Sequence, residues 1–253
     1  MNMKPLLPFG ELLGSGWDQF IRDWKINLEL SIRVLGASLL GFIATLLASP
    51  LPPSGAMVLR LIAVLAGATI IAHTTLILTD VVRKRDAGDP KAKYDDARGR
   101  ILFWPFIWIM VLRSLAVAGG LIVFMLPGIW MSIAFAFAPI ILLENGMRGN
   151  KALAASHELV KGRWWQTFGR LLGSGFVVGF LMMITILVLA IFIGLFVGFD
   201  KSFVLATKGT SIGMQVPLTE GLQGILTGIV QAIFLPLIII YQVKIYHSLK
   251  KTR

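Results

Sequence analysis

The chain has 253 residues, of which 56% are hydrophobic and 15% charged, and its mean hydropathy is +0.80. Soluble globular domains have about 45–50% apolar and about 25% charged residues, and disordered chains are poor in apolar residues, so both classes are excluded. The formal net charge is +11. Because the basic residues lie between apolar stretches, we expect them to bind anionic lipid headgroups and not nucleic acid.

The N-terminal segment, residues 1–27, is expected to be a cytoplasmic amphipathic arm. Trp17, Phe20, Ile21 and Trp24 recur at three- and four-residue steps, which predicts a helix lying in the membrane interface. The segment lacks the apolar core and the small-residue cleavage site of a signal peptide. We therefore expect the first apolar stretch to act as an uncleaved targeting signal.

Six apolar stretches follow, and each is of the order needed to cross a bilayer core of about 30 Å. They are 28–49, 56–79, 101–125, 128–143, 170–199 and 218–243. The Pro- and Gly-rich segment 50–55 predicts a turn between the first two, and Pro127-Gly128 predicts a turn between the third and fourth. The sequence thus predicts an all-α, polytopic membrane protein with its six transmembrane helices, over 28–243, arranged as three hairpins. Residues 244–253 form a basic tail.

The distribution of Lys and Arg predicts the orientation. Nineteen of the 24 basic residues fall in 1–27, 80–100, 144–170 and 244–253, whereas the outer loop at 200–217 holds two. By the positive-inside rule both termini are expected in the cytoplasm.

A second amphipathic helix is predicted on the cytoplasmic face, from Asn150 to Gly162. The chain then continues as Arg163-Trp164-Trp165, a basic and aromatic group suited to the headgroup level. Two interpretations stay open: these residues contact lipid headgroups or a partner, or they only anchor the bundle in the interface.

Two polar side chains are expected deep in the membrane. His73 lies in the second stretch, and Arg113 lies about the middle of the third. Charges are costly in hydrocarbon, so Arg113 should face the bundle interior or a hydrated cavity. It is a candidate contact for an anionic substrate or a lipid phosphate, with His73 as a second candidate; the alternative is that Arg113 satisfies helix-end carbonyls or snorkels.

No arrangement of residues indicates catalysis. The chain has three His without metal-ligand spacing, no Cys, and no Gly-rich phosphate loop. We expect no enzymatic activity, no cofactor and no bound metal.

One segment resembles a known family. Residues 126–172 combine Pro-Gly-Ile, an apolar span ending in Ala-Pro, Glu-x-Gly, and an Ala-x-x-x-Ser-x-x-Leu-x-Lys-Gly run. This pattern resembles bacterial integral membrane proteins of the YciC type and the membrane domain attached to some glycerophosphoryl diester phosphodiesterases. The matching positions include Pro127, Gly128, Pro139, Glu144, Gly146, Ser156, Lys161, Gly162 and Trp165. The resemblance implies a six-helix inner-membrane protein associated with lipid or envelope physiology, without the separate phosphodiesterase domain.

The function expected from these features is that of a non-enzymatic inner-membrane accessory protein. It would bind anionic phospholipid or a partner, either a membrane protein or a second copy of the chain, and support envelope homeostasis. The alternative is a small transporter or channel for an anionic or amphiphilic substrate that uses Arg113 and His73.

Overall fold

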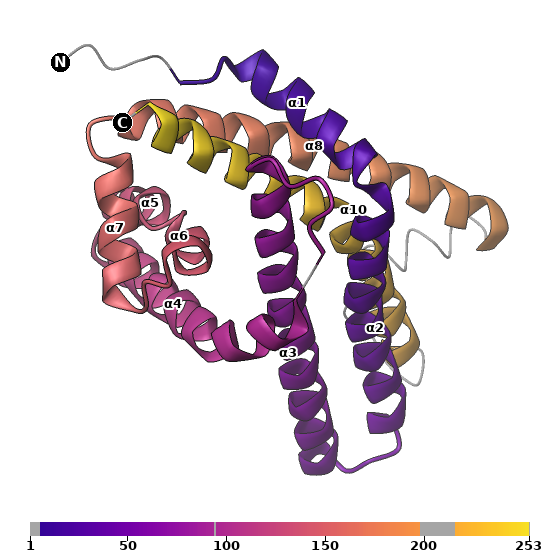
Figure 1. The fold of residues 1–253 in the computed structure, drawn as a ribbon. Coiled ribbons are helices and arrows are strands. Elements are labelled where there is room, and N and C mark those ends of the chain that lie inside the picture. The colour runs from indigo at the N-terminus through magenta and orange to yellow at the C-terminus, as the bar shows by residue number, and fades with distance from the viewer. Residues whose placement is uncertain (1–5, 94, 198–215, 253) are drawn as a thin grey trace. The chain divides into compact units, whose positions relative to one another are not determined.

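The structure, a computed structural model, describes residues 6–93, 95–197 and 216–252 (Figure 1). The outer loop expected at 200–217 lies almost wholly outside these residues. The described elements are the helices α1 (Phe9–Arg22), α2 (Trp24–Ala48), α3 (Pro53–Asp86), α4 (Asp96–Val123), α5 (Met125–Ala134), α6 (Ala138–Asn145), α7 (Asn150–Val160), α8 (Trp164–Val197) and α10 (Val216–Lys251). No strand occurs among them.

Six stretches of the described residues are long and apolar enough to cross a membrane. Five lie in α2, α3, α4, α8 and α10, and α5 and α6 together form the sixth. This confirms the predicted all-α, polytopic fold with six transmembrane helices.

Several helices extend past the apolar stretches into charged sequence. α3 continues from 79 to Asp86, and α10 continues from 243 to Lys251. Basic side chains in the last turns, such as Arg85 and Lys250, suit the negative end of the helix dipole. α4 begins earlier than the apolar stretch because the Asp95 side chain accepts hydrogen bonds from the N–H groups of Ala97 and Arg98.

The fourth span is not one continuous helix. α5 ends at Ala134, three residues follow in turn conformation, and α6 begins at Ala138. Pro139 stands in the first turn of α6, where its missing N–H costs little, so it starts a new helix and does not kink an existing one.

The turn between the third and fourth spans also differs from the prediction. α4 and α5 are separated by Phe124, which is extended, and Pro127-Gly128 lie inside the first turns of α5. Gly128 is there because the two helices touch: a Cβ on Gly120 would come within 2.9 Å of the Gly128 Cα and N atoms. The Pro-Gly pair thus serves close packing, and the turn lies three residues earlier than expected.

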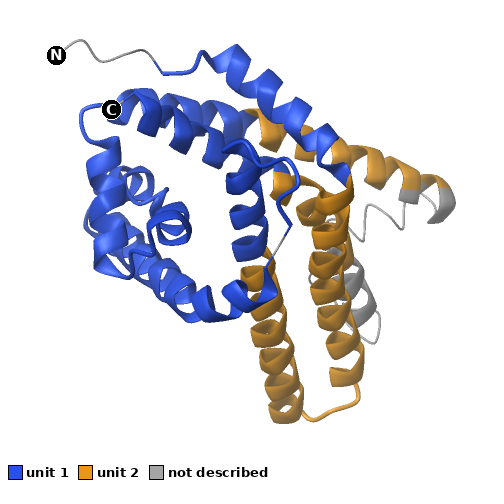
Figure 2. Ribbon diagram, viewed as in Figure 1, with its two compact units in different colours: residues 1–24, 75–176, 237–253 blue, residues 25–74, 177–236 orange. Residues whose placement is uncertain are grey.

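The chain divides into two compact units, which Figure 2 shows in different colours. Unit 2 comprises 25–74 and 177–236. Its helices approach through small residues: the Ser31 hydroxyl donates to the Ala232 carbonyl over 2.5 Å, and Gly67 faces Ala37. Such contacts supply the dispersion and hydrogen bonding that hold transmembrane helices together.

Unit 1 comprises 1–24, 75–176 and 237–253. Within it α4 packs against α5, α6 and α7, and α7 packs against α5 and α6. Its core contains fully buried aromatic and aliphatic side chains, among them Phe106, Phe137 and Ile240. This unit also carries most of the charged helix ends and is where the candidate site lies.

Adjacent glycines in α4 test the close contact with α5. We expect Gly120→Ala to lower the free energy of unfolding by about 1–3 kcal/mol, because the new methyl group meets α5 backbone. Gly119→Ala is the control, since nothing lies within 4 Å of its Cβ position and Ala favours helix. Thermal unfolding in detergent measures both; equal behaviour of the two variants would contradict the contact.

Candidate functional site

Charged and polar side chains gather at one end of unit 1, where α1, α3, α6 and α10 end. We call this group the ionic cluster; its members are Asp23, Asp80, Arg83, Lys84, Arg85, Asp86, Glu144, Lys244, Tyr246, His247 and Lys250. These residues are far apart in sequence and are brought together by the fold.

The end of α10 contributes partners to two carboxylates. Lys244 Nζ lies 2.9 Å and His247 Nδ1 lies 2.5 Å from the carboxylate of Asp86 on α3. One turn further on, Lys250 Nζ lies 2.6 Å from Glu144 Oε1 on α6, and the Tyr246 hydroxyl donates to Glu144 Oε2. The Tyr246 ring also packs against Phe137 at a centroid distance of 6.1 Å. α10 therefore ties α3 to α6 within unit 1.

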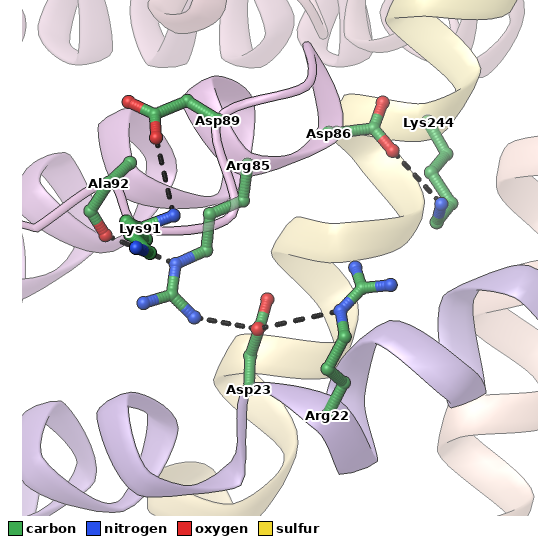
Figure 3. Close-up of polar contacts among 8 residues, drawn as sticks. All are labelled: Arg22, Asp23, Arg85, Asp86, Asp89, Lys91, Ala92 and Lys244. Atoms are coloured by element: carbon green, nitrogen blue, oxygen red, sulfur yellow. Dashed lines mark hydrogen bonds and ion pairs between the residues drawn. The ribbon is translucent and has the colours of Figure 1, made fainter.

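A third carboxylate of the cluster, Asp23, joins the end of α1 to the end of α3. Asp23 lies between the guanidinium groups of Arg85 and Arg22 (Figure 3), and the distance from Arg85 Nη1 to Asp23 Oδ1 is 2.6 Å. Arg85 Nε also donates to the Ala92 carbonyl over 3.1 Å. Asp23 and Arg85 are both largely buried, with side-chain exposures of 6% and 15%, and Asp23 is the carboxylate that pairs with the Arg85 guanidinium group.

The fourth carboxylate, Asp80, is paired within α3 itself. Arg83 Nη2 lies 2.9 Å from Asp80 Oδ1, and Lys84 Nζ lies 2.6 Å from Asp80 Oδ2. These cations follow Asp80 in the helix by three and four residues, a spacing that brings side chains together. Each Asp of the ionic cluster thus faces two basic groups, and the cluster retains excess positive charge.

Three further arginines of unit 1 donate to uncharged acceptors. Arg98 Nη2 donates to the Leu143 carbonyl at the end of α6 over 2.7 Å. Arg163 donates to the hydroxyl and, over 2.7 Å, to the carbonyl of Thr252 at the end of α10. Arg170 donates to the carbonyls of Leu7 and Gln166. For Arg98 and Arg170, the carbonyls satisfy the donors without cancelling the charge.

Trp164 and Trp165, at the corner where α7 is followed by α8, differ in their contacts and exposure. Trp164 stacks on Phe168 at 5.2 Å, and its Nε1 donates to the Trp130 carbonyl over 3.4 Å. Trp165 is 76% exposed, and Lys161 before it is 66% exposed. Arg163, expected beside them at the headgroup level, is 6% exposed and bound to Thr252. Among these residues, Trp165 and Lys161 are the ones available to a ligand.

Ser156 of α7 forms hydrogen bonds with backbone groups at the break in the fourth span. Its hydroxyl donates to the Ala134 carbonyl over 2.7 Å and accepts the Phe137 N–H over 3.1 Å. Because the helix is interrupted here, neither backbone group has its usual helical partner. Ser156 supplies the missing bonds from a fully buried position. The Ser of the family-like pattern therefore has a structural role that sequence alone did not indicate.

The other residues of that pattern mark helix ends or close contacts. Gly146 and Gly162 have φ of +67° and +78°, a conformation that favours glycine after a helix. Glu144 belongs to the ionic cluster, and Lys161 pairs with Glu158 at 3.3 Å. The structure thus accounts for these positions through helix termination and charge pairing.

The two deep polar residues fall in different units. His73 is in unit 2, on α3, and Arg113 is in unit 1, on α4; both are half-buried. Among the described residues, no group of three or more His, Asp or Glu side chains is arranged to hold a metal ion.

Comparison with family models, with curated proteins and with solved structures gives no match to this chain. The resemblance of 126–172 to the YciC type and the phosphodiesterase membrane domain therefore stays a prediction.

Removing the Asp23 charge tests the buried pair. We expect Asp23→Asn to lower the free energy of unfolding by about 3 kcal/mol, because Arg85 is left buried without a counter-charge. Glu158→Gln is the control: its pair with Lys161 is exposed, so the change should stay within about 1 kcal/mol. Denaturation in mild detergent measures both, and similar losses would argue against a special role of the buried pair.

Removing the Ser156 hydroxyl tests the repair of the break. Ser156→Ala leaves the Ala134 carbonyl and the Phe137 N–H buried and unpaired, which should cost about 1–3 kcal/mol. Ser132→Ala, on α5, removes only a bond to its own helix at Ile129 and should be nearly neutral. An unchanged melting temperature for Ser156→Ala would show that another group takes over its bonds.

Proposed function

We propose that this chain is a non-enzymatic accessory protein of the bacterial inner membrane that binds anionic phospholipid at the charged end of unit 1, with both termini in the cytoplasm. The observation that carries the proposal is the uncompensated charge there. Arg98 and Arg170 both donate to neutral carbonyl oxygens. Lipid phosphates are the counter-charges that a membrane surface offers to such a region.

The aspartates of the same region already have basic partners. Asp23, Asp80 and Asp86 each face two basic side chains, so they have little capacity left to neutralise the arginines. Exposed cations such as Lys151 and Lys251 add to the excess. A negatively charged leaflet attracts each nearby Lys or Arg by about 1 kcal/mol.

The α7–α8 corner offers the matching apolar group. Trp165 is exposed next to Lys161, while Trp164 and Arg163 beneath it are fixed by Phe168 and Thr252. An indole at headgroup depth with a cation beside it is the usual arrangement at a membrane interface. The fixed scaffold means that binding orders few additional side chains, which favours affinity.

The family resemblance and the distribution of basic residues agree with this proposal. Nineteen of the 24 Lys and Arg residues fall on the side that carries both termini, which supports a cytoplasmic position for the charged end. A YciC-type relationship would place the protein among inner-membrane proteins associated with envelope physiology.

Lipid retention tests the proposal. We expect the full-length protein, released in mild detergent, to retain phosphatidylglycerol in preference to phosphatidylcholine in native mass spectrometry. The double variant Lys161→Gln/Trp165→Ala should reduce this preference about five-fold, since about 1 kcal/mol is lost with the charge. High salt should weaken the preference as well.

Phe176→Ala is the matched control, because Phe176 lies on α8 like Trp165 and is 75% exposed but has no basic neighbour in the adjacent turn except the carbonyl-bound Arg170. Its phosphatidylglycerol preference should equal that of the unmodified protein. Equal retention of the two lipids by the unmodified protein would overturn the proposal.

A further inference from the structure

Arg113 lies on the inward face of α4. The buried residues Gly99, Leu102, Phe106 and Ile109 follow one another at three- and four-residue steps, and Gly120 further along the helix is buried as well. Arg113 continues this row, four residues after Ile109 and seven before Gly120. Residues at such spacing share one face of a helix, so Arg113 lies on the face of α4 that carries its buried residues.

Arg113 differs from the other inward-facing arginines of unit 1 because it makes no hydrogen bond or ion pair with any described residue. Arg98 and Arg163 in the same unit are each held by a carbonyl. A guanidinium group has five N–H donors, and leaving them unpaired in a half-buried position inside an apolar helix is costly. Among the described residues, none therefore provides an acceptor for the Arg113 guanidinium group.

The α4–α5 hairpin places Arg113 at the level of the broken span. The helices meet at Phe124 and touch at Gly120 and Gly128. Arg113 lies eleven residues before Phe124, and Phe135 lies eleven residues after it. Since both helices rise by about 1.5 Å per residue, Arg113 and the break at 135–137 are at similar distances from the turn.

The polar groups of the break are already engaged. Ser156 occupies the Ala134 carbonyl and the Phe137 N–H, and the Phe135 carbonyl accepts the N–H of Ala138 over 3.4 Å. These groups do not act as the acceptor for Arg113. Broken membrane helices lined by protein are, in transporters and channels, places where polar ligands bind.

The start of α7 lies beside the same part of α4. A Cβ on Gly149, which precedes α7, would lie 3.5 Å from the Trp108 ring and 4.0 Å from Leu112 Cδ1. The exposed cations Arg148 and Lys151 flank this glycine. Positive charge thus lies at the start of α7, next to this part of α4, and no described carboxylate pairs with Arg113.

We propose that Arg113 binds the phosphate group of an anionic phospholipid within unit 1, at the level of the break between α5 and α6. A phosphate matches the planar guanidinium with paired, charge-assisted hydrogen bonds, and it neutralises the charge. Leu115, two residues further on, is 64% exposed and offers an apolar surface to an acyl chain. The inference adds an interior site to the surface proposed above and rests on that proposal for the nature of the ligand.

The test measures the stability of the full-length protein in dodecylmaltoside during titration with dioleoylphosphatidylglycerol, and separately with inorganic phosphate. We expect the lipid to raise the unfolding temperature of the unmodified protein, and Arg113→Leu to weaken the apparent affinity about ten-fold or more. Arg60→Leu is the matched control, because Arg60 also lies in an apolar helix but is exposed. It should titrate like the unmodified protein.

Arg113→Lys keeps the charge and loses the planar geometry, so an intermediate affinity is expected, and this variant serves if Arg113→Leu does not fold. If inorganic phosphate raises the unfolding temperature as much as the lipid does, the ligand is a free anion, and the proposal that Arg113 binds a phospholipid is overturned. The same lipid affinity in the unmodified, Arg113→Leu and Arg113→Lys proteins would overturn the site. Loss of the response in Lys161→Gln/Trp165→Ala, with Arg113 variants unaffected, would leave only the surface proposal.

Discussion

The end of α10 is the element on which unit 1 depends. Lys244 and His247 engage Asp86 on α3, Tyr246 and Lys250 engage Glu144 on α6, and Thr252 accepts Arg163 at the start of α8. The Ser248 hydroxyl accepts the Leu7 N–H, and Gly16 of α1 allows the Tyr241 ring to approach closely. One helix end thus satisfies charges and backbone groups from elements scattered over the chain, and in a low-dielectric setting such groups are costly when left alone.

Charge pairing in unit 1 follows a consistent pattern. Carboxylates are surrounded by more than one cation, as at Asp80, and several arginines, such as Arg98, are satisfied by helix-end carbonyls. Helix ends in a membrane protein need donors because no water is present in the hydrocarbon, and arginine supplies several at once. The same arrangement leaves positive charge in place, and this is the charge on which the proposed binding of anionic lipid depends.

Hydropathy alone predicted the six spans and the fold class, because a bilayer core demands about 20 apolar residues whatever their order. The break at Phe135-Ala136-Phe137 was not predictable, since these residues are as apolar as their neighbours and Pro139 equally suits a kink. The acceptor of Arg163 is a carbonyl 89 residues away, and backbone acceptors leave no mark in a sequence. Arg113 could be singled out from its depth, but its position beside the broken span required the Phe124 turn.

The pairing of Ser156 with the broken span joins two segments that a hydropathy profile would treat as independent, one apolar and one amphipathic. The Ser156 side chain of α7 bonds to backbone groups of residues 134–137. Residues 237–252 supply partners of Asp86, Glu144 and Arg163. Segments that are synthesised early therefore lack these partners until later segments have been synthesised. During synthesis the fourth span is made before α7, and the ionic cluster stays incomplete until α10 has been made. Assembly of unit 1 is therefore a late event in biogenesis, and its intermediates expose charge that must remain at the membrane surface.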